Sequence, residues 1–214
     1  MKGFLTILAL LAALGGLVLL QHPSLASNEP LLKRGKHIME TMPANEEGHY
    51  KRAYLAGGCF WCLESEFRGK DGIVFTRVGY MGGHVENVTY QQITTGETGH
   101  AETVEVTYDP AIISYPDLVT FFLTKAHDPT TLNRQGVDVG TQYRSALFYN
   151  DEDEKKQAEA LIEKINKDGL YQNPVVTQIT PVQTFWLGEE YHQQYYEKYR
   201  AKTGRDHIRV ILKH

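Results

Sequence analysis

The chain of 214 residues contains only two cysteines, Cys59 and Cys62, and none follows them. A chain of this length buries most of its apolar surface on folding and does not need covalent cross-links to form a core. A bridge between the two cysteines would close a very short loop, and the stabilisation from a disulfide grows with the length of the loop that it closes. A structural role therefore explains the cysteine pair poorly, and we look for a chemical role instead.

Other features that would indicate particular classes of protein are also missing. The formal net charge is -4 and there is no long basic run, which argues against nucleic acid as the main partner because phosphate binding needs clustered Lys and Arg. Nine histidines are present, but none are paired at the spacing of metal ligands, which disfavours a zinc site. There is no internal repeat and no low-complexity tract. The apolar share of 42% and the charged share of 22% are typical of one soluble globular domain.

The N-terminal segment has the features of an export signal. Lys2 supplies a positive charge, residues 4–20 form an apolar run, and residues 24–26 place small side chains where a signal peptidase recognises them. We therefore expect cleavage after Ala26 and a periplasmic or otherwise extracytoplasmic location. An uncleaved membrane anchor is the alternative, because the apolar run is slightly long for a signal. Residues 27–52 are polar and are predicted to form a linker or a loosely docked extension.

The hydrophobic pattern predicts an α+β domain over residues 53–214. The predicted helices are 59–68, a helix capped by Ser114 that carries Leu118, Phe121 and Phe122, a helix that starts after Asn150 or Asp151 and ends at Gly169, and 190–202. The predicted strands are 53–56, 73–80, a strand through Val104, Val106 and Tyr108 with one buried face, 145–149, 175–185 with an edge position or a bend at Pro181, and 208–212. Because helices and strands alternate irregularly, we expect two layers, with helices packed on a mixed or antiparallel sheet.

The segment Gly57-Gly58-Cys59-Phe60-Trp61-Cys62 carries the strongest signal for chemistry. Two glycines let the backbone turn tightly, so the next residue can start a helix. A cysteine at a helix N-terminus is expected to have a lowered pKa, and the thiolate is the reactive form. In a helix the two Cα atoms would lie roughly 5–6 Å apart, within the range that a disulfide spans. Cys59 can therefore attack and become oxidised, and Cys62 can then resolve it.

Other interpretations of the pair stay open at this point. A structural disulfide is one of them, and a thioredoxin-like motif is another, because Cys-x-x-Cys in an α/β setting is its mark. A haem attachment site would need His after the second cysteine, where the chain has Leu63. Phe60 and Trp61 can form an apolar cup beside the thiolate, because methyl groups and sulfur atoms pack well against aromatic rings. The plain alternative is that they are core residues.

Several motifs resemble those of a known family, the peptide methionine sulfoxide reductases of type A. The matching segments are 57–62, 79–83, 89–90, 98–102, 127–129, 134–145 and 191–195. The resemblance runs from about residue 53 to residue 196, and its separate motifs occur in the right order. It implies a ferredoxin-like core and the reduction of the S epimer of methionine sulfoxide, free or in proteins, as repair after oxidation.

The resemblance also implies roles for single residues in the reaction. The Cys59 thiolate would attack the sulfoxide sulfur and become a sulfenic acid, while Glu102 protonates the oxygen. Cys62 would resolve the sulfenic acid as a disulfide, which an external thioredoxin-like reductant would open. No metal or organic cofactor is implied. We expect a monomer that meets a membrane only through an uncleaved N-terminal segment.

The remaining roles concern substrate binding. Tyr90 and Tyr143 would bind the sulfoxide oxygen and stabilise the charge that develops on it. Asp138 would line the pocket as a polar group, and Phe60 and Trp61 would hold the methyl group. These assignments come from the family pattern, since a lone glutamate, aspartate or tyrosine would carry no signal. His100 and His192 also lie in the motifs, and we expect structural hydrogen bonds from them.

One departure from the family pattern concerns Cys62. Many members have Gly at this position and place resolving cysteines near the C-terminus, whereas this chain has none after Cys62. Either Cys62 resolves the sulfenic acid or the reductant acts on Cys59 directly. Two other functions stay open, namely a thiol-disulfide oxidoreductase that acts on protein disulfides and a non-enzymatic module that binds methionine-rich segments.

Overall fold

The computed structural model describes residues 49–206. The predicted export signal, most of the polar extension and the predicted strand at 208–212 lie outside this range. The elements follow one another as β1 (Lys51–Gly57), α3 (Phe60–Arg68), β2 (Ile73–Met81), α4 (Tyr90–Ile93), β3 (Ala101–Tyr108), α5 (Tyr115–Phe121), the π-helical turn η1 (Phe122–Ala126), β4 (Arg134–Gln135), β5 (Asp138–Val139), the 3-10 turn η2 (Thr141–Tyr143), β6 (Ser145–Tyr149), α6 (Glu152–Lys167), β7 (Gln178–Pro181), β8 (Trp186–Leu187), the 3-10 turn η3 (Glu190–His192) and α7 (Tyr195–Thr203).

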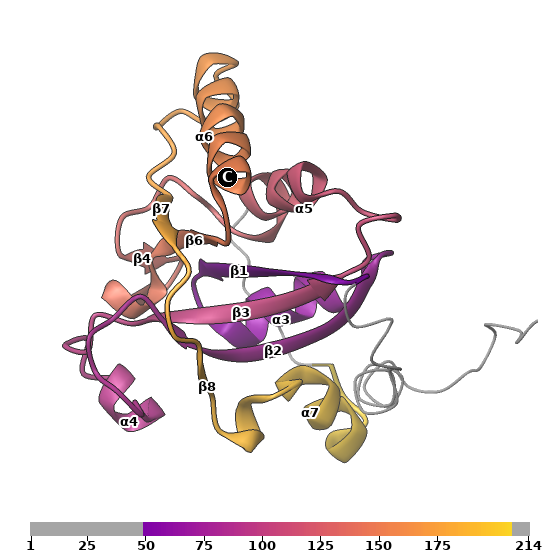
Figure 1. Ribbon diagram of the computed structural model, residues 1–214. Coiled ribbons are helices and arrows are strands. Elements are labelled where there is room, and N and C mark those ends of the chain that lie inside the picture. Colours follow the sequence, from indigo (N-terminus) through magenta and orange to yellow (C-terminus); the bar gives the residue numbers. More distant parts are fainter. Residues whose placement is uncertain (1–48, 207–214) are drawn as a thin grey trace, which may run out of the picture.

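Within the described residues, the main sheet has the strand order β7-β6-β1-β3-β2-β8. β6, β1, β3, β2 and β8 pair antiparallel, and β7 joins β6 in parallel. The chain order β1-α3-β2-β3-α5-β6 with the spatial order β6-β1-β3-β2 is that of a ferredoxin-like core (Figure 1). The predicted α+β class with a mixed, mainly antiparallel sheet is therefore confirmed.

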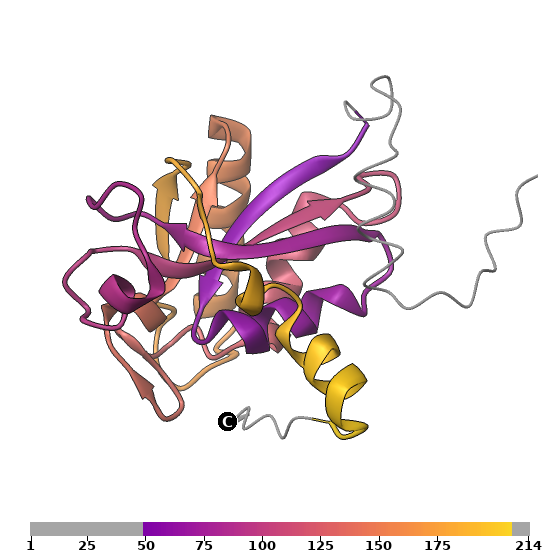
Figure 2. The same cartoon turned by 90° about the horizontal axis from the view of Figure 1, so that it is seen from below.

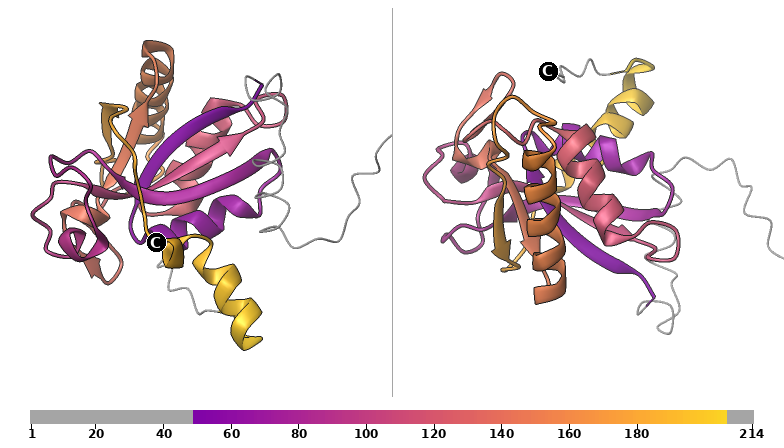
Figure 3. Two further views of the ribbon diagram at one scale, coloured as in Figure 1. Left: turned by 60° about the horizontal axis from the view of Figure 1, so that its bottom comes forward. Right: turned by 90° about the horizontal axis from the view of Figure 1, so that it is seen from above.

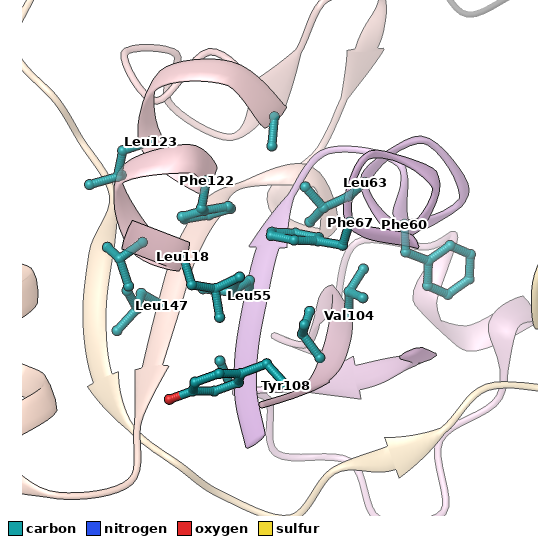
Figure 4. Close-up of a cluster of buried hydrophobic side chains, with 14 of the residues drawn as sticks. Leu55, Phe60, Leu63, Phe67, Val104, Tyr108, Leu118, Phe122, Leu123 and Leu147 are labelled. Carbon is teal, nitrogen blue, oxygen red and sulfur yellow. The ribbon is translucent and has the colours of Figure 1, made fainter. Parts of the chain in front are cut away.

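The main hydrophobic core lies between one face of this sheet and the helices α3 and α5. Phe60, Leu63 and Phe67 lie on one side of α3, as their helical spacing predicts, and all three are fully buried. Leu63 and Phe67 lie next to Phe122 of η1, whereas Phe60 points towards the other side of the cluster (Figure 4). This packing fixes the position of the first turn of α3, where the two cysteines lie.

The opposite face of the sheet is covered by the segment between β7 and β8, which we call the strap (residues 182–185). The strap leaves the edge next to β6, crosses the sheet and joins β8 at the far edge beside β2 (Figure 1). Its residues Val182 and Phe185 pack against a second cluster that includes Met81 and Phe148. As a result β3 is buried on both faces, which corrects the prediction of a strand with one buried face.

Most predicted element ends agree with the structure, because local side chains set them. Ser114 Oγ accepts a hydrogen bond from the Asp117 N–H at the start of α5, and Asp151 caps α6 through the N–H groups of Asp153 and Glu154. Of the predicted strand 175–185 only β7, Gln178–Pro181, is formed; it lies on the sheet edge and ends at the proline, as expected there. β1 starts at Lys51, two residues before the predicted start at 53.

The prediction of one helix over 190–202 is wrong. The chain forms η3, breaks at Gln193 and Gln194, and starts α7 only at Tyr195. Gln194 adopts a left-handed backbone with φ 49°, and its side chain and backbone N–H bind the buried carboxylate of Glu64. Gln193 forms two hydrogen bonds with the backbone of Val78 in β2. These long-range bonds hold the chain in a non-helical path.

Two features of the periphery bear on the site. Figures 2 and 3 show α7 at one side of the domain, where it starts near α3 and projects away from it. α4 and the hairpin formed by β4 and β5 lie on the opposite side of the domain from α7 (Figure 2). Among residues 49–206, no helix is both long and apolar enough to cross a membrane.

Candidate active site

The glycine pair places Cys59 at the start of α3. Cys59 is the N-cap residue of that helix. A Cβ atom on Gly57 would lie 2.8 Å from the His127 ring, and Gly58 has φ +89° with no room for a side chain beside Gln135. Any other residue at these two positions would move the loop. The structure thus confirms the predicted tight turn before Cys59.

Glu102 lies directly against this turn. It is the second residue of β3, pairs with Tyr80 across the sheet and is 2% exposed. Its Oε2 atom accepts a hydrogen bond of 3.0 Å from the Phe60 N–H. Burial raises the pKa of Glu102 to about 8, with smaller contributions from Asp138 and Cys62, although the Phe60 hydrogen bond opposes the shift. The carboxyl group is therefore mostly protonated at neutral pH.

The electrostatics of Cys59 differ from the sequence-based expectation. Its hydrogen bond with Cys62, its burial and the charge of Glu102 all raise the pKa of the Cys59 thiol. The expectation of a lowered pKa is therefore wrong for the resting protein. The main physical reasons are the hydrogen bond with the Cys62 side chain and the burial of the sulfur, which outweigh the lowering by the backbone hydrogen bond from Cys62. The N–H of Phe60, the first residue of α3, donates to Glu102. Cys59 is thus a protonated thiol at rest.

The three polar residues implied by the resemblance gather around Glu102. Tyr90 comes from α4, Asp138 from β5 and Tyr143 from η2. Burial and then Glu102 raise the pKa of Tyr90 to about 12, and the same causes raise the pKa of Tyr143. Burial raises the pKa of Asp138. Both tyrosines are therefore neutral and keep hydroxyl hydrogens that they can donate.

Phe60 and Trp61 have different environments. Phe60 is 1% exposed and packs against the rings of Tyr90 and His192 at centroid distances of 6.4 and 5.0 Å. Trp61 is partly exposed, and its ring stacks on Tyr195 at 3.8 Å with an interplanar angle of 8°. Phe60 therefore belongs to the core as well as to the site, whereas Trp61 forms part of the rim.

Sequence reasoning missed Glu189, which organises one wall of the site. Its carboxylate accepts hydrogen bonds from the Tyr90 N–H at 2.9 Å and from the Tyr80 hydroxyl at 2.7 Å. No motif quoted from the sequence includes this residue. Its role depends on α4 and β2 meeting the chain before η3, which only the tertiary structure shows.

The two motif histidines form structural hydrogen bonds, as expected. His192 is fully buried, and its Nδ1 atom accepts a hydrogen bond of 3.0 Å from the indole N–H of Trp61. This bond fixes the orientation of the Trp61 ring. The Nδ1 atom of His100 accepts a hydrogen bond from the Gly83 N–H, and its Nε2 atom lies 2.8 Å from the carbonyl oxygen of Val85.

Cys62 is partly exposed and lies within hydrogen-bonding reach of Cys59. The two cysteines form no disulfide in the structure. The Sγ atom of Cys62 also lies 3.0 Å from the hydroxyl oxygen of Tyr196 on α7. Over the described residues, no group of three or more His, Cys, Asp and Glu side chains could hold a metal ion. The site therefore contains a buried carboxyl group, Glu102, next to two thiols, Cys59 and Cys62, with the aromatic rings of Phe60 and Trp61 beside them.

This chain is similar to known proteins in both its sequence and its fold. The family model described as peptide methionine sulfoxide reductase matches residues 51–213. Peptide methionine sulfoxide reductase MsrA of Methanothermobacter thermautotrophicus is 52% identical over 149 residues, which cover 70% of this chain and 88% of that protein. The crystal structure of reduced Mxr1 from Saccharomyces cerevisiae superposes with a TM-score of 0.67 at 36% identity, covering 75% of this chain and 90% of that one. Mxr1 in complex with Trx2 superposes with a TM-score of 0.50 at 27% identity, covering 72% and 91%.

Proposed function

Because this chain belongs to the peptide methionine sulfoxide reductase family and reduces methionine sulfoxide with an external thiol reductant, we propose that Cys59 is its nucleophile, Glu102 its acid and Cys62 its resolving thiol. The observation that carries this proposal is the 3.0 Å hydrogen bond between the Phe60 N–H and Oε2 of Glu102. That bond places a buried, protonated carboxyl group at the residue next to Cys59.

The first step transfers oxygen from the substrate to Cys59. The Cys59 sulfur attacks the sulfoxide sulfur while Glu102 gives its proton to the sulfoxide oxygen. The attack forms an S–S bond between Cys59 and the substrate. The protonated oxygen then passes to the Cys59 sulfur as the S–O bond of the substrate and this S–S bond break, so methionine leaves and Cys59 becomes a sulfenic acid. Glu102 gives one proton to the sulfoxide oxygen and takes up the proton that Cys59 loses. Glu102 therefore ends the step protonated, as it began. The raised pKa values of both groups suit this exchange, because each holds a proton at rest.

The substrate is held by hydroxyl groups on one side and by aromatic rings on the other. Tyr90 and Tyr143 donate hydrogen bonds to the sulfoxide oxygen, and Asp138 lines the same side of the pocket. Phe60 and Trp61 contact the methyl group. Because the oxygen and the methyl group of a sulfoxide occupy fixed positions around the sulfur, this arrangement selects one epimer, which we propose to be the S form.

The second step closes a disulfide between Cys62 and Cys59 and releases water. An external thioredoxin-like protein then opens the disulfide by thiol exchange. The contact between the two thiols supports this step. Mxr1, a structural relative of this chain, has been crystallised in complex with Trx2, which supports a partner of this kind.

We also propose that the enzyme repairs oxidised proteins outside the cytoplasm, as a monomer. The support is the apolar run at 4–20 with small residues at 24–26. In this proposal residues 27–52 connect the signal to the reductase domain of residues 53–214. The mass of the protein purified from its native host tests it: a mature chain that begins at Ser27 supports export, whereas an intact N-terminus in a cytoplasmic fraction refutes it.

A direct assay tests the assigned reaction against its competitors. The domain is incubated with resolved S and R epimers of methionine sulfoxide and with dithiothreitol, and methionine is measured. We expect reduction of the S epimer alone. Equal reduction of both epimers would contradict the proposed pocket. Insulin disulfide reduction faster than sulfoxide reduction would favour a thiol-disulfide oxidoreductase, and binding without turnover would favour a methionine-binding module.

A further inference from the structure

Tyr196 lies next to the second cysteine of the site. Its hydroxyl oxygen is 3.0 Å from the Sγ atom of Cys62, at a sequence separation of 134 residues. Cys62 is the third residue of α3, and Tyr196 is the second residue of α7. The contact therefore connects α7 to Cys62, the residue of α3 that the proposed function assigns to the resolving step.

The first turn of α7 holds this hydroxyl in place. The residue before Tyr196 stacks on Trp61 at 3.8 Å, and the residue after it, Glu197, accepts a hydrogen bond of 2.9 Å from Arg68. Figures 2 and 3 show that the start of α7 lies near α3, from which the rest of α7 points away. None of the side chains of α7 is buried, so contacts of this kind, and not an apolar face, position the helix and with it the Tyr196 ring.

We propose that Tyr196 is a positioning residue for the resolving step, which holds the Cys62 sulfur and stabilises it as a thiolate. The inference rests on the proposed role of Cys62. In this step the Cys62 sulfur attacks the sulfur of the Cys59 sulfenic acid, the S–O bond breaks and an S–S bond forms. The leaving hydroxide takes the proton that Cys62 has lost and departs as water. The sulfenic acid is the oxidant, so no other one is needed.

The chemistry of the contact explains why the hydroxyl matters at this stage. In the reduced protein either the thiol or the hydroxyl can donate. Once Cys62 has lost its proton, only Tyr196 has a hydrogen to give. A hydrogen bond to a charged acceptor is stronger than one between neutral groups. The contact therefore favours the attacking form of Cys62 and has no part in the first step, which uses Cys59 and Glu102.

Tyr196→Phe tests the proposal, because it removes the hydroxyl and keeps the ring. Reduced protein is mixed with excess methionine sulfoxide in a quenched single-turnover experiment without reductant. Methionine release and loss of the first of the two thiols report the first step, and loss of the second thiol reports disulfide formation. We expect methionine release within about twofold of wild type and disulfide formation about 10- to 100-fold slower at pH 7. A sulfenic acid on Cys59 should accumulate and react with dimedone.

A pH series and a matched variant separate positioning from general structural damage. The difference in disulfide formation should narrow as the pH rises, because a larger fraction of a thiol is then thiolate without the hydroxyl. Tyr199→Phe removes a hydroxyl one turn later on α7 and should match wild type in both steps. Unchanged disulfide formation in Tyr196→Phe would overturn the proposal, as would an equal loss in both steps or a difference that does not vary with pH.

The same experiment separates this inference from the proposed function. Cys62→Ser should release methionine once and keep a dimedone-reactive Cys59. If instead it releases no methionine, or its Cys59 does not stay reactive towards dimedone, the assigned role of Cys62 fails and the inference about Tyr196 fails with it. If Cys62→Ser behaves as expected and Tyr196→Phe behaves like wild type, only the role of Tyr196 is wrong.

Discussion

Replacing Glu102 with Gln removes the ionisable group from the site and keeps the shape of the side chain. The amide oxygen can still accept the hydrogen bond from the Phe60 N–H, so the start of α3 should stay in place. The amide cannot give a proton to the sulfoxide oxygen. The rate of methionine release should therefore fall by about 10²–10⁴-fold, the usual contribution of general acid catalysis.

The same substitution should stabilise the folded protein at neutral pH. Burial raises the pKa of Glu102 from 4.5 to about 8. Between these pH values the folded protein keeps a proton that the unfolded chain has lost, so wild-type stability falls as the pH rises from about 4.5 to about 8. One pKa unit corresponds to about 1.4 kcal/mol. At pH 7 the penalty is therefore on the order of 3 kcal/mol, and Glu102→Gln should be more stable by this amount.

Urea unfolding and single-turnover kinetics measure the two effects on the same samples. The stability difference between Glu102→Gln and wild type should be large at pH 7 and should vanish below about pH 4.5, where both side chains are neutral in both states. Methionine release by wild type should decline above about pH 8, as Glu102 loses its proton. Glu97→Gln, at an exposed position, is the control and should change neither quantity. Wild-type kinetics in Glu102→Gln would refute its role as the acid, and equal stability at pH 7 would refute the account of its burial.

Three further predictions concern the turn and the thiols. Cys59→Ser should abolish methionine release, since a hydroxyl cannot replace the thiol as nucleophile here; residual turnover above background in a methionine assay would contradict the assignment. Cys62→Ser should release one equivalent of methionine per chain and then stop without added thiol, which mass spectrometry would detect as a single added oxygen on Cys59; full turnover at the wild-type rate would show that another group resolves the sulfenic acid. Gly58→Ala should lower the free energy of unfolding by about 1–2 kcal/mol or more, because the residue has φ +89° and its Cβ would lie 2.5 Å from the Gln135 side chain; an unchanged urea midpoint would show that the loop adapts without strain.

The parts of the site that the sequence predicts are those set by neighbours in the chain. The glycine pair before Cys59 predicts a helix start, and Cys59 is the N-cap of α3. The spacing of Phe60, Leu63 and Phe67 predicts which side of that helix is buried. Each of these depends on backbone geometry within a few residues, so the pattern alone is enough. The role of Glu102, in contrast, came only from the family resemblance, because nothing near it in sequence distinguishes it from an exposed glutamate.

The predictions that were wrong concern contacts between distant segments. The pKa of the Cys59 thiol is raised at rest by its hydrogen bond with Cys62, by burial and by Glu102, and the last two of these causes depend on the tertiary fold. The last helix is interrupted because Gln194 binds Glu64 at a separation of 130 residues. A helical pattern in the sequence contains no information about partners at such distances, so propensity predicts one continuous helix where tertiary hydrogen bonds prevent it.

The strap and the two strands that it connects have a consequence for aggregation during folding. The stretch from β7 to β8 supplies the outermost strand at both ends of the sheet and, between them, the cover over one face. Unpaired strand edges are sites at which chains associate with one another. β8 pairs with β2, with Leu187 opposite Gly79. Pairings between such distant parts of a chain form slowly during folding. Until this stretch docks, both edges and an apolar face are exposed together, so a nascent or nicked chain is prone to aggregation at a stage when its active-site turn can already be formed.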